Sequence, residues 1–180
     1  MAKAVDIYTQ AEVDMMLALP KFAEYEAQMY WASSRRQTGL LTADFVAHPE
    51  DPTTGITYRV EVAKNERIES FNILLQGKID DHPMEGLCRY NVHNSMHENE
   101  CANCGPPPAI LPTEFHVHRY NEACVRKGHV WDSCATLLTV SGGDTFLEDT
   151  RILTETFVRN MMITFRDSVA LAWIYGPGGL

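Results

Sequence analysis

The chain has 180 residues, of which 45% are hydrophobic, and a formal net charge of -9 from 24 acidic and 15 basic residues. Such a chain is expected to form one domain over residues 1–180 and to bury about 70% of its unfolded surface, which excludes a disordered chain and one that needs a metal merely to fold. The excess of acidic residues disfavours nonspecific binding to a nucleic-acid backbone and suits a basic protein partner. Recognition of nucleic acid by a local site stays an open alternative.

Targeting and redox signals point to a cytoplasmic protein. Residues 1–7 include a lysine and an aspartate and lack the apolar segment of a signal peptide. No run of 18 apolar residues occurs, so we expect no membrane span. The five cysteines are an odd number. In a chain long enough to fold without cross-links, this favours thiols or a metal over a disulfide framework.

The first expected element is a helix that begins at Thr9. Thr9 and Glu12 have the spacing of a capping box, in which each side chain bonds the other residue's backbone amide. Pro20 lacks an amide hydrogen and disfavours helix in the residue before it, so a break is expected there. A second helical piece is expected after the break, carrying Phe22, Tyr25 and Met29.

The middle of the chain has the patterns of β-strands. Apolar residues at 58, 60 and 62 alternate with polar ones, which places the apolar set on one face of a strand. Strands are expected at residues 41–47, 58–62, 70–76, 87–93 and 115–120. Short polar connections between them predict antiparallel neighbours.

A second helix is expected over residues 145–165, after a turn at residues 141–144. Residues 176–179 are glycine-rich and predict a loose tail. The predicted fold is therefore α+β, an antiparallel sheet of about five strands flanked by an N-terminal helix and a C-terminal helix.

Four of the seven histidines and two of the five cysteines lie between residues 93 and 118. Side chains two apart on a strand point to the same face, so His116, His118 and Tyr120 are expected to share one. The Cβ atoms of the two histidines would lie roughly 7 Å apart, close enough for both imidazoles to bind one metal. A partly exposed polar strand face is the alternative.

Cys101 and Cys104 have the spacing that lets two thiolates meet one zinc ion from a tight turn. The remaining ligands could come from four histidines, namely His93, His97, His116 and His118. Zinc accepts this mixture of sulfur and nitrogen, and a Cys2His2 site would be closed and structural. A free dithiol in a loop is the alternative, and a redox motif is disfavoured because prolines, not a helix start, follow the pair.

The same region could instead carry acid–base chemistry. Histidine titrates near neutral pH, and an arginine can stabilise the charge that develops on a phosphate. The candidate catalytic residues for such a hydrolase, including an RNA-cleaving one, are Arg89, His97, His116, His118 and Tyr120.

Short motifs give the chain a resemblance to a family of small prokaryotic proteins catalogued only as a domain of unknown function. The matching segments are Tyr8-Thr9-Gln10-Ala11-Glu12-Val13, Leu17-Ala18-Leu19-Pro20-Lys21, Leu87-Cys88-Arg89-Tyr90-Asn91, His97-Glu98-Asn99 and His116-Val117-His118-Arg119-Tyr120. The chain departs from the family pattern at Asn91, where an aspartate is usual, and at Glu100-Cys101, where Pro-Asp is usual. The Cys101 and Cys104 pair is additional.

The resemblance implies a setting near phages, mobile elements and toxin–antitoxin loci, and it supports the histidine positions more than the cysteine pair. Three functions are therefore carried forward. The first is a toxin-like or defence-related hydrolase, and the second is a non-catalytic phage or mobile-element protein that inhibits a host defence complex through its acidic surface. The third is a zinc-stapled structural module. The sequence predicts no oligomeric state.

Overall fold

The computed structural model describes residues 7–23, 32–33, 39–65, 67, 69–92, 97–99, 101–102, 104, 109–111 and 114–165. The helices are α1 (Gln10–Ala18), α2 (Glu122–Val125) and α3 (Phe146–Asn160), with a 3-10 helix at Pro52–Thr54. The strands are β1 (Lys21–Ala23), β2 (Ala32–Ser33), β3 (Leu40–Pro49), β4 (Ile56–Asn65), β5 (Ser70–Ile79), β6 (Glu85–Val92), β7 (His97–Glu98), β8 (Ala109–Ile110), β9 (His116–Arg119), β10 (Ala135–Leu137) and β11 (Ile163–Phe165).

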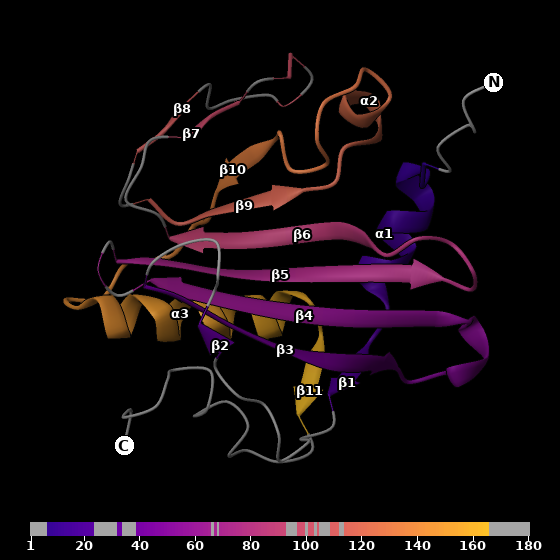
Figure 1. The fold of residues 1–180 in the computed structure, drawn as a ribbon, viewed down its shortest axis with the longest axis horizontal. Coiled ribbons are helices and arrows are strands. Elements are labelled where there is room, and N and C mark those ends of the chain that lie inside the picture. Colours follow the sequence, from indigo (N-terminus) through magenta and orange to yellow (C-terminus); the bar gives the residue numbers. More distant parts are fainter. Residues whose placement is uncertain are drawn as a thin grey trace.

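Nine of these strands form one sheet in the order β10-β9-β6-β5-β4-β3-β1-β11, with β2 paired to β3 (Figure 1). Among the described strands, β1 and β11 are the parallel pair and the other neighbours are antiparallel. The predicted mixed fold with a mainly antiparallel sheet is confirmed, but the expected size of about five strands is too small. Four strands of this sheet are only two or three residues long, too short for a periodic pattern.

The long strands β3, β4 and β5 show why the alternation predicted them well. Tyr58, Val60 and Val62 are all 0% exposed, as expected for the apolar face of β4. Each pairs with a buried partner, for example Val60 with Leu75 of β5. The other face of β4 carries polar side chains such as Arg59, as in many antiparallel sheets that face water on one side.

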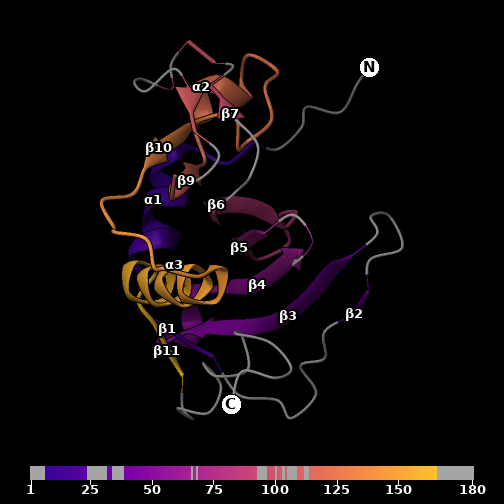
Figure 2. The same ribbon diagram turned by 90° about the vertical axis from the view of Figure 1, so that its left-hand side faces the viewer.

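Helices α1 and α3 lie on the same face of the sheet (Figure 2). The ring of Phe157 packs edge-on against Tyr90 of β6, with the ring centroids 5.4 Å apart, and Leu153 is fully buried beside it. These residues belong to the main hydrophobic core, which lies between the sheet and the helices. Burying one side chain of this size contributes about 1.5–3 kcal/mol.

The predicted capping box at the start of α1 is present. The Thr9 hydroxyl accepts from the Glu12 amide at 3.3 Å, and the Glu12 carboxylate accepts from the Thr9 amide at 2.7 Å. The helix ends at Ala18, and Leu19 is already extended with ψ of 135°, because Pro20 follows it.

The predicted second helical piece is wrong at Phe22, which lies in β1. Lys21 explains the change, because its amide donates to the Met162 carbonyl at 2.9 Å and aligns the segment with β11. Its ammonium group, 1% exposed, donates to carbonyls at the ends of both long helices, those of Leu17, Leu19 and Met161. Two further positions of that predicted piece, Tyr25 and Met29, lie outside the described residues.

The C-terminal helix is also shorter than predicted. It ends at Asn160, and Met162 then takes a positive φ of 53°, which turns the chain into β11. The predicted glycine-rich tail lies outside the described residues. Within the described ranges, no helix combines the length and the apolar character needed to cross a membrane.

Candidate metal centre

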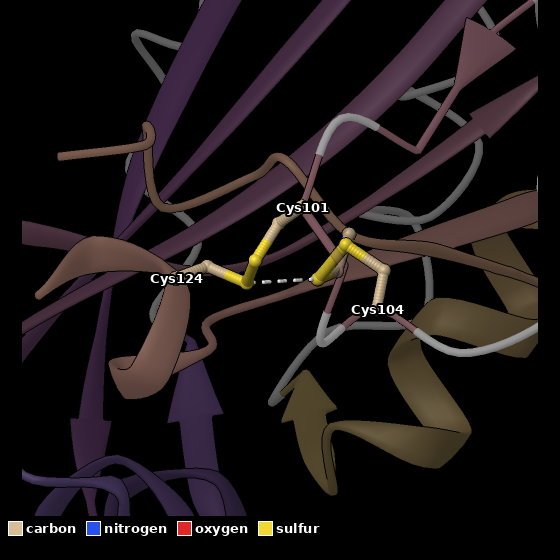
Figure 3. Close-up of side chains that lie close together, drawn as sticks. Cys101, Cys104 and Cys124 are labelled. Atoms are coloured by element: carbon tan, nitrogen blue, oxygen red, sulfur yellow. Dashed lines mark hydrogen bonds between the residues drawn. A yellow bond between two sulfur atoms is a disulfide. The ribbon is translucent and has the colours of Figure 1, made fainter. Parts of the chain in front are cut away.

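Four cysteines gather near the end of the sheet formed by β10 and β9. Figure 3 shows Cys101, Cys104 and Cys124 of this group. Cys101 and Cys104 lie between β7 and β8, Cys124 lies on α2, and Cys134 directly precedes β10. All four sulfur atoms lie within 4.8 Å of one another. We call residues 121–134 and the described part of residues 97–111 the cysteine lobe.

The sulfurs are joined as two disulfides in this structure. Cys101 pairs with Cys124 and Cys104 with Cys134, with Cα atoms 6.0 and 4.8 Å apart. The two disulfides also touch each other, because the Cys124 and Cys134 sulfurs are 3.5 Å apart. The sequence favoured free thiols or a metal over disulfides, whereas the structure contains two disulfides. The close grouping of the four sulfurs also suits a metal.

Local turns aim these side chains at a common point. The Cys104 amide donates to the Cys101 carbonyl at 2.9 Å, which closes a tight turn and brings both sulfurs to one side. The Asn121 side chain caps α2 by accepting from the Cys124 amide at 3.2 Å. A second turn before Cys134 forms because the Ser133 amide and hydroxyl both donate to the Val130 carbonyl.

The cysteine cluster is separate from the main core. Cys124, Cys101 and Cys134 are 1%, 3% and 8% exposed, and Cys104 is half-buried. These residues pack against one another as their own small cluster. Other apolar residues of the lobe are also buried, because Ile110 is 0% exposed and Val125 and Trp131 pack against the main core.

Polar contacts fasten the lobe to the sheet. The Asn99 side chain donates to the Ala135 carbonyl at 3.0 Å and accepts from the Ala135 amide at 2.7 Å, as a neighbouring strand would. On the other side of the lobe, Asp132 forms an ion pair of 2.8 Å with Arg89 of β6. Burial lowers the pKa of Arg89 and the nearby Asp132 carboxylate opposes that shift, so this charge pair bridges lobe and sheet.

The predicted histidine pair lies under this lobe. His116 and His118 are 1% and 0% exposed, and their ring centroids are 5.1 Å apart. Nδ1 of His116 donates to the Glu114 carbonyl at 2.9 Å, and Nδ1 of His118 donates to the Asp132 carbonyl at 2.6 Å. A carbonyl oxygen only accepts, so both rings carry a proton on Nδ1 and serve to hold chain segments.

Arg89 joins this pair, as the sequence suggested, because Arg89 and His118 are direct partners across β6 and β9. Asn91 is likewise the partner of His116 and approaches its Nε2 at 3.3 Å. Two buried polar atoms here, Arg89 Nε and Asn91 Oδ1, have no hydrogen-bond partner in the described part of the chain.

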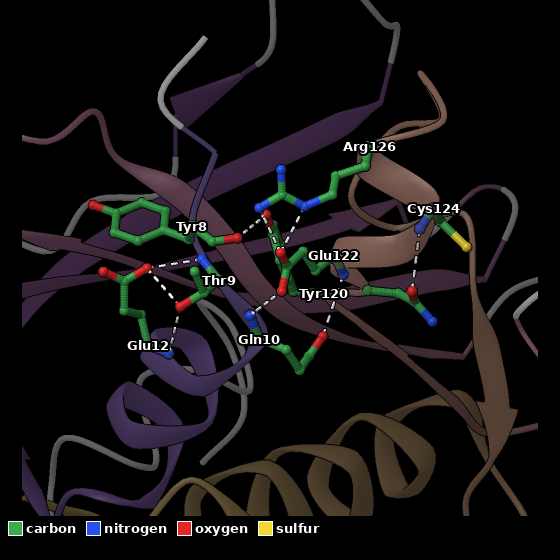
Figure 4. A network of polar contacts seen from close by, with 9 residues as sticks. Tyr8, Thr9, Gln10, Glu12, Tyr120, Glu122, Cys124 and Arg126 are labelled. Carbon is green, nitrogen blue, oxygen red and sulfur yellow. Dashed lines mark hydrogen bonds and ion pairs between the residues drawn. The ribbon is translucent and has the colours of Figure 1, made fainter. Parts of the chain in front are cut away.

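Tyr120 does not join the histidines. It lies one residue past the end of β9, its hydroxyl donates to the Tyr8 carbonyl at 2.8 Å, and it belongs to the main core (Figure 4). Burial raises its pKa to about 12. Next to it, Gln10 and Glu122 exchange two hydrogen bonds that tie α1 to α2.

The remaining predicted site residues are only partly placed. His97 lies in β7 opposite Ile110, and nothing is described of its side chain. His93 lies outside the described residues. Neither His116 nor His118 belongs to the metal-compatible group of the described residues, which consists of the four cysteines alone.

The sequence therefore predicted Cys101 and Cys104, which are half of this centre, but did not indicate Cys124 and Cys134. The feature that could have indicated Cys124 and Cys134 is the connection between two strands. Residues 121–134 link β9 to β10, which are antiparallel neighbours, so both ends of this segment return to the same edge of the sheet. The fifth cysteine, Cys88, is buried in the core, and burial raises its pKa to about 12, so it stays a thiol.

No family model, no curated protein and no solved structure matches this chain.

Proposed function

We propose that the four cysteines of the lobe bind one zinc ion as thiolates, and that the protein is a non-catalytic binding module stiffened by this metal. The observation that carries the proposal is the convergence of four sulfurs within 4.8 Å from three separate places in the chain. Two structural disulfides require closeness only within each pair, whereas one metal requires closeness among all four.

The dimensions suit a tetrahedral zinc centre. With zinc–sulfur bonds of about 2.3 Å, neighbouring sulfurs lie roughly 3.8 Å apart. The contact of 3.5 Å between Cys124 and Cys134 and the overall limit of 4.8 Å bracket that value. Small side-chain movements in the reduced protein are enough to admit the ion.

Four protein ligands leave zinc no open position, which is typical of structural sites and not of catalytic ones. The lobe needs such support, because β7 and β8 form a sheet of only two residue pairs. A stiffened lobe on an acidic chain, with net charge -9, suits the recognition of a basic protein partner.

Metal content tests the proposal directly. Protein purified under reducing conditions and supplied with zinc should hold one zinc per chain by mass spectrometry of the metal. Cobalt in its place should give the intense sulfur-to-metal absorption of a tetrathiolate. Cys134→Ser should lose both signals, and the matched control Cys88→Ala should keep them. Less than about 0.2 zinc per chain in the reduced protein, or a bound iron chromophore, would overturn the zinc assignment.

The hydrolase remains a second candidate because Arg89, His116 and His118 do come together. Buried polar atoms without partners cost about 1–3 kcal/mol each, and such atoms occur here on Arg89 and Asn91. Catalysis would require the lobe to lift, since both imidazoles are enclosed. RNA cleavage that is present in the wild type and absent in His116→Ala and His118→Ala would support this candidate, and unchanged cleavage would remove it.

A further inference from the structure

The disulfides of the lobe join the same chain segments that a zinc ion would join. Neither disulfide closes the short Cys101–Cys104 turn on itself. One links this turn to α2 and the other links it to the residue before β10. Both covalent states therefore hold the turn and the 121–134 segment together.

Because every sulfur lies within 4.8 Å of the other three, conversion between the two states joins atoms that are already neighbours. The tight turn at Cys101 and the capped α2 remain as they are, since their hydrogen bonds involve neither metal nor disulfide.

We propose that the lobe is a redox switch, in which a peroxide oxidises the four thiolates to these two disulfides and releases zinc. This inference rests on the proposed zinc site. One state carries a bound dication and four thiolates, the other carries two neutral disulfides, and the fold of the lobe is kept in both.

The chemistry balances with two molecules of hydrogen peroxide per site. A thiolate attacks one peroxide oxygen, the oxygen–oxygen bond breaks, and the departing hydroxide takes a proton to become water. A second thiolate then attacks the resulting sulfenic sulfur, forming the sulfur–sulfur bond and expelling hydroxide, which also becomes water. Each pair of thiolates thus gives two electrons to one peroxide as its disulfide forms, and zinc leaves as the hydrated ion once its thiolates are consumed.

Exposure sets the order of the two steps. Cys104 is half-buried, whereas the other three cysteines are at most 8% exposed. Oxidation of thiols follows their access to the oxidant, so Cys104 reacts first. Its partner is Cys134, and the Cys104–Cys134 bond therefore forms before the Cys101–Cys124 bond.

The test starts from the reduced, zinc-loaded full chain. Hydrogen peroxide is added in steps, released zinc is followed with a chromogenic chelator, free thiols are counted, and disulfides are mapped by peptide mass spectrometry. We expect two equivalents to release the whole zinc and to lower the free thiols from five to one, Cys88. One equivalent should give mainly the Cys104–Cys134 peptide. A thiol reductant with added zinc should restore the starting state.

Three results would overturn the switch while leaving the zinc site standing. They are retention of zinc after thiol loss, a Cys101–Cys104 disulfide as the main product, and oxidation to sulfinic acids without disulfides. Failure of the reduced protein to bind zinc at all would instead refute the proposed function. Cys88→Ala serves as the control and should release zinc with the same peroxide dependence.

Discussion

The helix-covered part of the sheet and the cysteine lobe are held together by different means. The first buries large side chains such as Tyr58, Tyr90 and Phe157 almost completely. The second has fewer large buried side chains, such as Ile110, and adds two disulfides or a metal and a few polar contacts. A chain with ample apolar burial in one region can therefore carry a second region in which links between sulfur atoms supplement a smaller apolar contact.

The largest expected effect comes from breaking the core. Phe157→Ala removes a ring that is 1% exposed and packs on Tyr90, so we expect a loss of about 3–5 kcal/mol in the free energy of unfolding. Chemical denaturation measures it. Glu155→Ala on the same helix, at a side chain 54% exposed, is the matched control and should change stability by less than about 0.5 kcal/mol.

Breaking one link of the lobe should have a smaller and local effect. In the oxidised protein, Cys101→Ser combined with Cys124→Ser removes one disulfide and should cost about 2–4 kcal/mol. Hydrogen exchange should quicken at amides of residues 121–134 and stay slow in β4 and β5. Equal acceleration in both regions would show that lobe and core unfold as one unit.

The ion pair beneath the lobe provides a third comparison. Asp132→Ala leaves the charge of Arg89, whose side chain is 30% exposed, without its partner and should cost about 1–3 kcal/mol. Asp132→Asn keeps the size of the side chain but removes its charge, so it distinguishes the effect of the charge from the effect of packing. The double variant Arg89→Met with Asp132→Ala should recover much of the loss, and additive losses would contradict a direct interaction.

Asn99 tests how far the lobe depends on its polar attachment to β10. Asn99→Ala removes two hydrogen bonds to Ala135 and should cost about 1–2 kcal/mol. The change should appear as faster hydrogen exchange at Ala135, with zinc content unchanged. Loss of zinc from this variant would mean that the attachment also shapes the metal site.

The last comparison concerns the pH response of the core, which changes gradually over two pH units. Burial lowers the pKa of Lys21 from 10.5 to about 8, so between these values the unfolded chain binds more protons than the folded one. The free energy of unfolding of the wild type should therefore rise with pH relative to Lys21→Met, by about 1 kcal/mol per pH unit from 8 to 10. Taking the difference cancels the opposite contribution of Cys88, whose pKa is raised. A constant difference across this range would refute the shifted lysine.

The sequence predicted the elements whose pattern is local and long. The capping box at Thr9 and the alternation in β4 are visible in adjacent residues, and both are present. Short strands are not visible in this way. Phe22 was predicted in a second helical piece with Tyr25 and Met29, but pairing with β3 and β11 decides its conformation.

The candidate site was predicted in part for the same reason. Cys101 and Cys104 form a local pattern, and His118 with Arg89 follows from the proximity of two strands. Cys124 and Cys134 join the centre only through the return of the chain at β10, and a single sequence does not specify that pairing.

The position of β1 in the sheet has a consequence for the order of folding. This strand lies between β3 and β11, and its pairing with β11 joins residues 21–23 to residues 163–165. Contacts between such distant positions carry a large loop-closure entropy and form late. During synthesis, hairpins β3–β4 and β4–β5 can form while one edge of β1 is still unpaired. The emerging chain therefore exposes a strand edge, open to pairing with other chains, until β11 arrives.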